Sequence, residues 1–176
     1  MLKGSGYTSL MFIILLVFFT VGKVCASEPF SKLLKFSPLG FEVVDRRLST
    51  TDVNFEDVYP RHDENNRMLK IVLTYNKDEG TREKYIVILI ECGGILDTWS
   101  MYYRWAREKF GSFKALFNAF PPIYAYVEGR ADDTYYVTWI KFKRLFSVKG
   151  PDKEKVRDLY KLLKKFMSVA EPSGMT

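Results

Sequence analysis

Histidine and cysteine are scarce in this sequence, which contains one histidine, His62, and two cysteines, Cys25 and Cys92. Two cysteines are too few for a disulfide framework, and 176 residues can bury a core that folds without one. One histidine and no paired-cysteine motif argue against a zinc site. No glycine-rich phosphate-binding loop is present either. We therefore expect neither a metal nor a cofactor.

The composition is that of a folded domain. Apolar residues make up 47% of the chain and charged residues 27%, a balance typical of globular proteins rather than disordered ones. Aromatic residues reach 16%, and most of them are phenylalanine and tyrosine. The length allows one domain of ordinary size in addition to a short N-terminal segment.

Residues 10–21 form an apolar run in which Thr20 is the only polar residue. The run is shorter than the roughly 20 residues of a membrane-spanning helix and fits the 7–15 of a signal-peptide core. Val24 and Ala26 offer the small residues that a signal peptidase reads, so cleavage after Ala26 is one interpretation. The lysines that follow, at positions 23, 32 and 35, favour a retained single-pass anchor instead.

Both interpretations of residues 1–26 export the rest of the chain. A cleaved signal predicts a secreted protein, and a retained anchor predicts a domain tethered in the cell envelope. We expect residues 27–170 to form a single domain and residues 171–176 to be a frayed tail.

Hydrophobic periodicity predicts strands and helices within this domain. Strands are expected at residues 41–47, 68–76 and 83–92 and within 123–129 and 133–150. Helices are expected from Asp97 or Thr98 to 110, over 112–120 and over 151–168. Residues 49–67, which include His62, are polar and rich in turn formers, so we expect a solvated loop there. The predicted fold is α+β, an antiparallel sheet of about five strands with helices packed on one face.

Cys92 ends a strand and precedes two glycines and a helix. A thiolate in that position could be stabilised by helix N–H groups, so Cys92 is a candidate nucleophile. The alternative is a buried cysteine that packs as a small apolar side chain. A nucleophilic cysteine also needs a base, and nothing in the sequence brings His62 close to it.

Positive charge collects late in the chain. Without residues 1–26, which contain two lysines and no acidic residue, the net charge falls from +6 to +4. The basic residues singled out for surface binding are Lys141, Lys143, Arg144, Lys161, Lys164 and Lys165. Such a face suits anionic lipid headgroups or an acidic protein partner. Nucleic acid is a poor candidate because the N-terminal segment predicts export.

Trp105 lies off the apolar stripe of its helix, so we expect it to make a surface contact. Together these features predict an exported or membrane-tethered, non-catalytic binding or accessory domain of the cell envelope. Its partner is expected to be a protein or the anionic membrane surface. The alternative is an envelope enzyme that uses Cys92 as a thiol nucleophile.

Overall fold

The computed structural model describes residues 28–62, 64–78 and 80–168. The chain divides into two compact units, residues 1–35 and 36–176. Helix α2 (Glu28–Leu34) belongs to the first unit, and every other described element belongs to the second. The predicted signal or anchor and the predicted frayed tail lie outside the described residues. Among the described residues, no helix is both long and apolar enough to cross a membrane.

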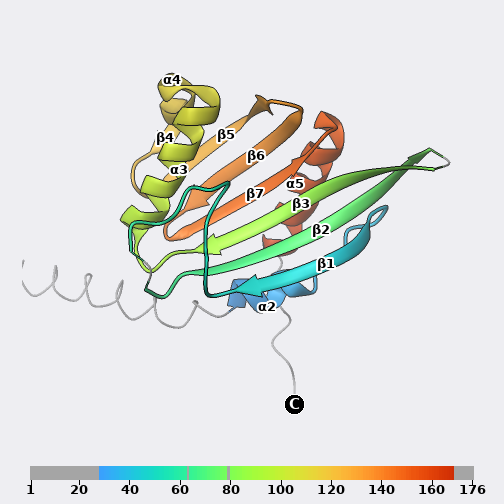
Figure 1. The fold of residues 1–176 in the computed structure, drawn as a ribbon, viewed down its shortest axis with the longest axis horizontal. Coiled ribbons are helices and arrows are strands. Elements are labelled where there is room, and N and C mark those ends of the chain that lie inside the picture. Colours follow the sequence, from blue (N-terminus) through green and yellow to red (C-terminus); the bar gives the residue numbers. More distant parts are fainter. Residues whose placement is uncertain (1–27, 63, 79, 169–176) are drawn as a thin grey trace, which may run out of the picture. The chain divides into compact units, whose positions relative to one another are not determined.

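The second unit is built on one antiparallel sheet of seven strands in the order β1-β2-β3-β7-β6-β5-β4 (Figure 1). The strands are β1 (Glu42–Ser49), β2 (Arg67–Asp78), β3 (Thr81–Glu91), β4 (Asn118–Phe120), β5 (Tyr124–Ala131), β6 (Thr134–Lys141) and β7 (Arg144–Gly150). The α+β class and the antiparallel pairing are confirmed. The predicted number of about five strands is wrong.

Two local features account for the additional strands. Residues 133–150 are two strands rather than one, because the chain turns sharply at Phe142, whose φ is 54°. Strand β4 forms where a helix was expected. Its three residues pair with β5, Asn118 opposite Tyr126 and Phe120 opposite Tyr124. The helix that precedes it is correspondingly shorter than predicted.

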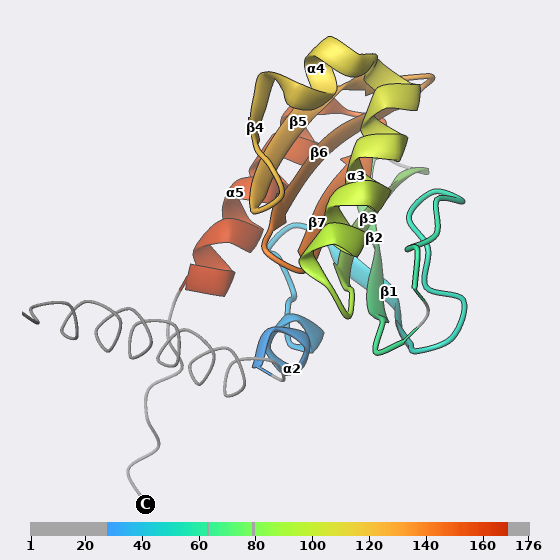
Figure 2. The ribbon, with the colours of Figure 1, turned by 90° about the vertical axis from the view of Figure 1, so that its left-hand side faces the viewer.

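Helices lie on both faces of the sheet, so the prediction that they cover one face is wrong. They are α3 (Ile95–Phe110), α4 (Ser112–Phe117) and α5 (Lys153–Ser168). Neighbouring residues of a strand point to opposite faces. In β6, Ile140 joins the buried cluster that includes α3, whereas the ring of Trp139 meets Tyr160 of α5 at 5.0 Å. Figure 2 shows α3 and α5 on either side of the sheet.

Amphipathic patterns explain the helices that were predicted well. The stripe of α5 buries Val156, Leu159 and Leu163, as their spacing predicts. Helix α3 starts at Ile95, slightly earlier than predicted, with Gly94 rather than Asp97 or Thr98 at its N-cap. It ends before Gly111, which takes the left-handed φ of 84° that glycine tolerates.

Candidate binding surface

The short helix α4 and strand β4 carry a row of exposed apolar side chains. Phe113 is 80% exposed, Phe117 69% and Phe120 68%, and Leu116 and Tyr124 are each 43% exposed. The rings of Phe113 and Phe117 contact each other at 5.5 Å. Within α4 only Ala115 is buried, because the helix is too short to turn its larger side chains onto the sheet. Contiguous exposed apolar side chains of this size typically mark a contact surface.

Two adjoining hollows border this row and form a shallow groove. Phe117, Asn118 and Tyr126 line both of them. The first hollow is completed by Ala119, Phe120, Tyr124 and Tyr160, and the second by Phe113, Lys114, Val127, Glu128, Tyr135 and Arg157. The groove therefore runs between the β4 edge of the sheet and helix α5, and aromatic rings make up most of its lining.

Three lysines border the same groove. Lys114 lines it, with its ammonium nitrogen 4.9 Å from the centroid of the Phe110 ring. Lys164 lies over Tyr160 at 5.5 Å, and Lys141 is the cross-strand partner of Tyr124. Within the described part of the chain, none of these three lysines is paired with a carboxylate. Their positive charge is therefore available to a ligand.

Phe142 extends the exposed apolar row at one end of the sheet. It is 50% exposed, and its backbone N–H donates a 2.7 Å hydrogen bond to the carbonyl of Ile123, in the turn between β4 and β5. We define the aromatic–basic surface as Phe113, Lys114, Leu116, Phe117, Phe120, Tyr124, Lys141, Phe142 and Lys164. It combines exposed rings with ammonium groups that pair with no carboxylate of the described residues.

The acidic residue in the groove is already neutralised. Glu128 accepts hydrogen bonds from the hydroxyls of Tyr126, at 2.6 Å, and Tyr135, and from the guanidinium of Arg157. Burial acts to raise the pKa of Glu128, but these three donors outweigh it and hold the pKa below its usual value. Burial, followed by the hydrogen bond to Glu128, raises the pKa of Tyr135 to about 12. The carboxylate thus remains ionised and paired, and it does not cancel the charge of the lysines.

The other predicted basic residues have different surroundings. Arg144 binds the buried carboxylate of Glu91 at 2.7 Å, and Arg67 binds it at 2.6 Å, so Arg144 holds strands together. Lys143 is half-buried in the turn after β6. Lys161 is exposed and 3.5 Å from Asp158, and Lys165 is exposed. The structure therefore brings Lys141 and Lys164 to the aromatic groove and gives Arg144 a structural contact.

Trp105 is not a surface residue, and the prediction of a surface contact is wrong. Its side chain is 1% exposed, and its ring lies 4.6 Å from Phe55 and 5.5 Å from Tyr136. It lies on the buried face of α3 together with Met101, Tyr102 and Ala106, and this face is rotated from the stripe that the sequence suggested. The segment between β1 and β2 contributes Phe55 to the same core.

Cys92 lies in an environment that disfavours the thiolate. It is fully buried, and burial raises the pKa of its thiol to about 11 although the nearby Thr98 side chain acts to lower it. His62 is closer to this region than the sequence suggested, with Nδ1 2.8 Å from a carboxylate oxygen of Asp97. Neither observation supports a nucleophilic role. In the described residues, no three His, Cys, Asp or Glu side chains gather as metal ligands would.

The aromatic part of the surface was missed because Phe113, Phe117 and Phe120 repeat at helical spacing, which predicts a buried helix face. The signal against burial was the glycine at 111 and the prolines at 121 and 122, which leave room for a very short helix only.

In comparisons with known proteins, no family model, curated protein or solved structure matches this chain.

Proposed function

We propose that the chain is an exported or membrane-tethered, non-catalytic binding domain that attaches to anionic membrane surfaces through the aromatic–basic surface. The exposure of Phe113, Phe117 and Phe120 on one short segment carries this proposal. A soluble domain rarely leaves three such rings in water without a contact to make. The lysines among them, which pair with no carboxylate in the described part of the chain, favour a partner that is both apolar and anionic, as a bilayer interface is.

The expected energies suit reversible attachment. A lysine near an anionic leaflet contributes about 1 kcal/mol, so Lys114, Lys141 and Lys164 together contribute about 3 kcal/mol. Complete burial of a phenylalanine is worth about 1.5–3 kcal/mol, and insertion at an interface gains part of that for each ring. Charge attracts the domain to the membrane, and the rings hold it there.

The experiment is sedimentation with vesicles. Because the hydrophobic N-terminal segment would itself bind lipid, we would use the chain from Ser27, which keeps every described element. Binding to vesicles that contain phosphatidylglycerol is compared with binding to pure phosphatidylcholine. The double variant Phe117→Ser, Phe120→Ser should bind anionic vesicles at least tenfold more weakly, given about 1 kcal/mol or more for each ring.

A matched control is Leu39→Ser, which removes another exposed apolar side chain. Leu39 is 95% exposed and lies outside the aromatic–basic surface. This variant should bind as the unaltered chain does. If the unaltered chain stays in the supernatant with anionic vesicles at low salt, the membrane proposal fails and an acidic protein partner becomes the better occupant of the groove.

A further inference from the structure

The segment between β1 and β2 inserts a hairpin tip into the core beneath α3. Phe55 donates a 2.9 Å backbone hydrogen bond to the carbonyl of Val58, and Val58 donates one of 3.0 Å in return. The two residues between them are Glu56 and Asp57. Phe55 is fully buried, with its ring 4.6 Å from that of Trp105. The tip, residues 54–58, thus presents an aromatic ring to the core.

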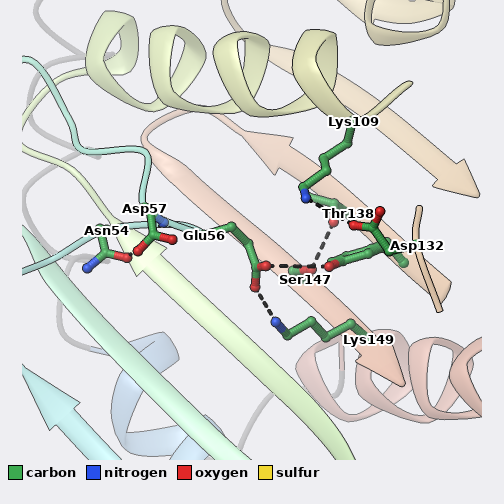
Figure 3. A network of polar contacts seen from close by, with 9 residues as sticks. Asn54, Glu56, Asp57, Lys109, Asp132, Thr138, Ser147 and Lys149 are labelled. Carbon is green, nitrogen blue, oxygen red and sulfur yellow. Dashed lines mark hydrogen bonds and ion pairs between the residues drawn. The ribbon is translucent and has the colours of Figure 1, made fainter. Parts of the chain in front are cut away.

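The next residue of the tip presents a carboxylate to the same region. Glu56 binds the ammonium group of Lys149 (Figure 3). It also accepts a 3.4 Å hydrogen bond from the Tyr136 hydroxyl. Lys149 and Tyr136 are cross-strand partners on β7 and β6, so they lie side by side on the face that α3 covers. Both side chains of the ion pair are largely shielded, at 16% and 21% exposure.

The turn that holds Glu56 is conformationally unfavourable for this residue. Glu56 and Asp57 both take left-handed backbone conformations, with φ of 52° and 65°. Two-residue turns of this kind favour asparagine and glycine, and a residue with a longer side chain is strained there. Placing the Glu56 side chain in this position therefore strains the backbone, and the tip is less stable than it would be with an Asn-Gly turn.

Further polar groups are buried in the core near the tip. The Thr138 and Ser147 hydroxyls form a fully buried 2.8 Å hydrogen bond two residue pairs further along the same two strands, on the same face of the sheet. The indole nitrogen of Trp105 is buried, and no described residue accepts a hydrogen bond from it. Apolar walls with a few polar groups, including a shielded lysine, are typical of a small-molecule site rather than of a plain core.

We infer that Phe55 and Glu56 fill a ligand site from within, and that the site binds a small aromatic carboxylate when the hairpin tip moves away. The ligand ring replaces the ring of Phe55, and its carboxylate replaces that of Glu56 on Lys149 and Tyr136. None of these residues belongs to the aromatic–basic surface, so this inference stands apart from the proposed membrane attachment.

The test measures binding of 3-phenylpropionate by titration calorimetry, with the neutral analogue 3-phenylpropan-1-ol for comparison. The full chain is used as it is recovered, in the same detergent for every variant where one is needed. Glu56→Ala and Phe55→Ala should each bind the acid at least tenfold more tightly than the unaltered chain. Glu56→Ala should gain no affinity for the alcohol, whereas Phe55→Ala, which vacates the ring position, should bind both ligands more tightly. Adding Lys149→Met to Glu56→Ala should abolish its gain for the acid.

Asp57→Asn is the matched control, because it alters the same turn, tolerates the left-handed conformation and leaves Lys149 paired. It should bind the acid as the unaltered chain does. If Phe55→Ala does not fold, as judged by circular dichroism, Glu56→Ala decides the question alone because it keeps the buried ring. An unchanged affinity for the acid in Glu56→Ala, or an equal gain for acid and alcohol in that variant, would overturn the inference.

Discussion

The ammonium nitrogen of Lys164 lies 5.5 Å from the centroid of the Tyr160 ring, and Tyr160 lines the same hollow as Phe117 and Phe120. The Tyr160 ring also contacts Trp139 at 5.0 Å and Tyr126 at 6.0 Å. Helix α5 thus brings its positive charge to the aromatic edge of the sheet. Two features that are far apart in the sequence, a basic helix and a phenylalanine-rich segment, form one surface.

The charge of this surface should control its attraction to lipid. We expect Lys164→Gln to weaken binding to phosphatidylglycerol vesicles about fivefold at low salt, and Lys141→Gln with Lys164→Gln about twenty-five-fold, from about 1 kcal/mol for each lysine. The difference should shrink as salt screens the charges. Lys84→Gln, an exposed lysine outside the surface, is the control in the same sedimentation series. An equal loss in Lys84→Gln would mean that only the net charge matters.

Glu91 should stabilise the sheet in a pH-dependent way. Burial acts to raise its pKa, but the hydrogen bonds from Arg144 and Arg67 outweigh that effect and keep the pKa below its ordinary value of 4.5. Glu91 therefore adds stability above about pH 4.5, and this stability is lost as the pH falls through the lowered pKa. Glu91→Gln should lower the free energy of unfolding by about 3 kcal/mol at pH 7, because it removes the buried carboxylate that the guanidinium groups of Arg67 and Arg144 both bind.

Urea unfolding of the two proteins across the pH range measures this effect. The difference in the free energy of unfolding between the unaltered chain and Glu91→Gln should be largest at pH 7 and should decrease as the pH falls. A difference that stays constant from pH 7 down to pH 3 would show that Glu91 acts through packing and not through its charge.

Cys92 should be slow to react and dispensable for binding. Because burial raises the pKa of its thiol to about 11, a thiol reagent at pH 7.4 should label the folded chain from Ser27 at least a hundredfold more slowly than the urea-unfolded chain. Cys92→Ala should keep full binding to anionic vesicles. Rapid labelling of the folded protein would contradict this prediction and support the hypothesis that Cys92 is a thiol nucleophile.

Gly150 should tolerate no larger side chain. A Cβ atom at this position would lie 2.2 Å from a carbon of the Tyr85 ring, and Tyr85 is fully buried. Gly150→Ala should therefore lower the free energy of unfolding by about 1–3 kcal/mol, as overpacked core substitutions do. Gly80→Ala is a useful comparison, since a Cβ there meets nothing within 4 Å and only the left-handed φ of 96° opposes it. Equal stability of Gly150→Ala and the unaltered chain would contradict the close contact.

Elements with an unambiguous period could be predicted from the sequence. The hairpin of β2 and β3 and the amphipathic helix α5 appear where alternation and helical spacing indicate them. The number of strands could not be predicted from the sequence. Strand β4 is only three residues long, and it is defined by its pairing with β5 at the sheet edge rather than by a sequence pattern of its own. The distribution of helices over both faces is also a tertiary property. The stripe of α5 fixes which side of the helix is buried and not which face of the sheet buries it.

The basic residues of the candidate surface could be predicted from the sequence, and its exposed aromatic residues could not. Lys141 and Lys164 follow from charge patterning, whereas the exposure of Phe113 and Phe117 depends on how little of α4 reaches the sheet. Trp105 illustrates the converse error. The buried face of its helix is not the stripe that the aromatic spacing indicated, because Tyr136 of β6 and Phe55, fifty residues before Trp105, both pack against the indole ring.

The most direct test of the membrane proposal places a reporter on the surface itself. Phe117→Cys in the chain from Ser27 is labelled with a nitrobenzoxadiazole fluorophore, which buried Cys92 should not take up, and Leu39→Cys is labelled as the control. On addition of phosphatidylglycerol vesicles, the emission at position 117 should rise and shift to the blue, and that at position 39 should not change. Sedimentation with the vesicles without a spectral change at position 117, or an equal change at both positions, would contradict the account.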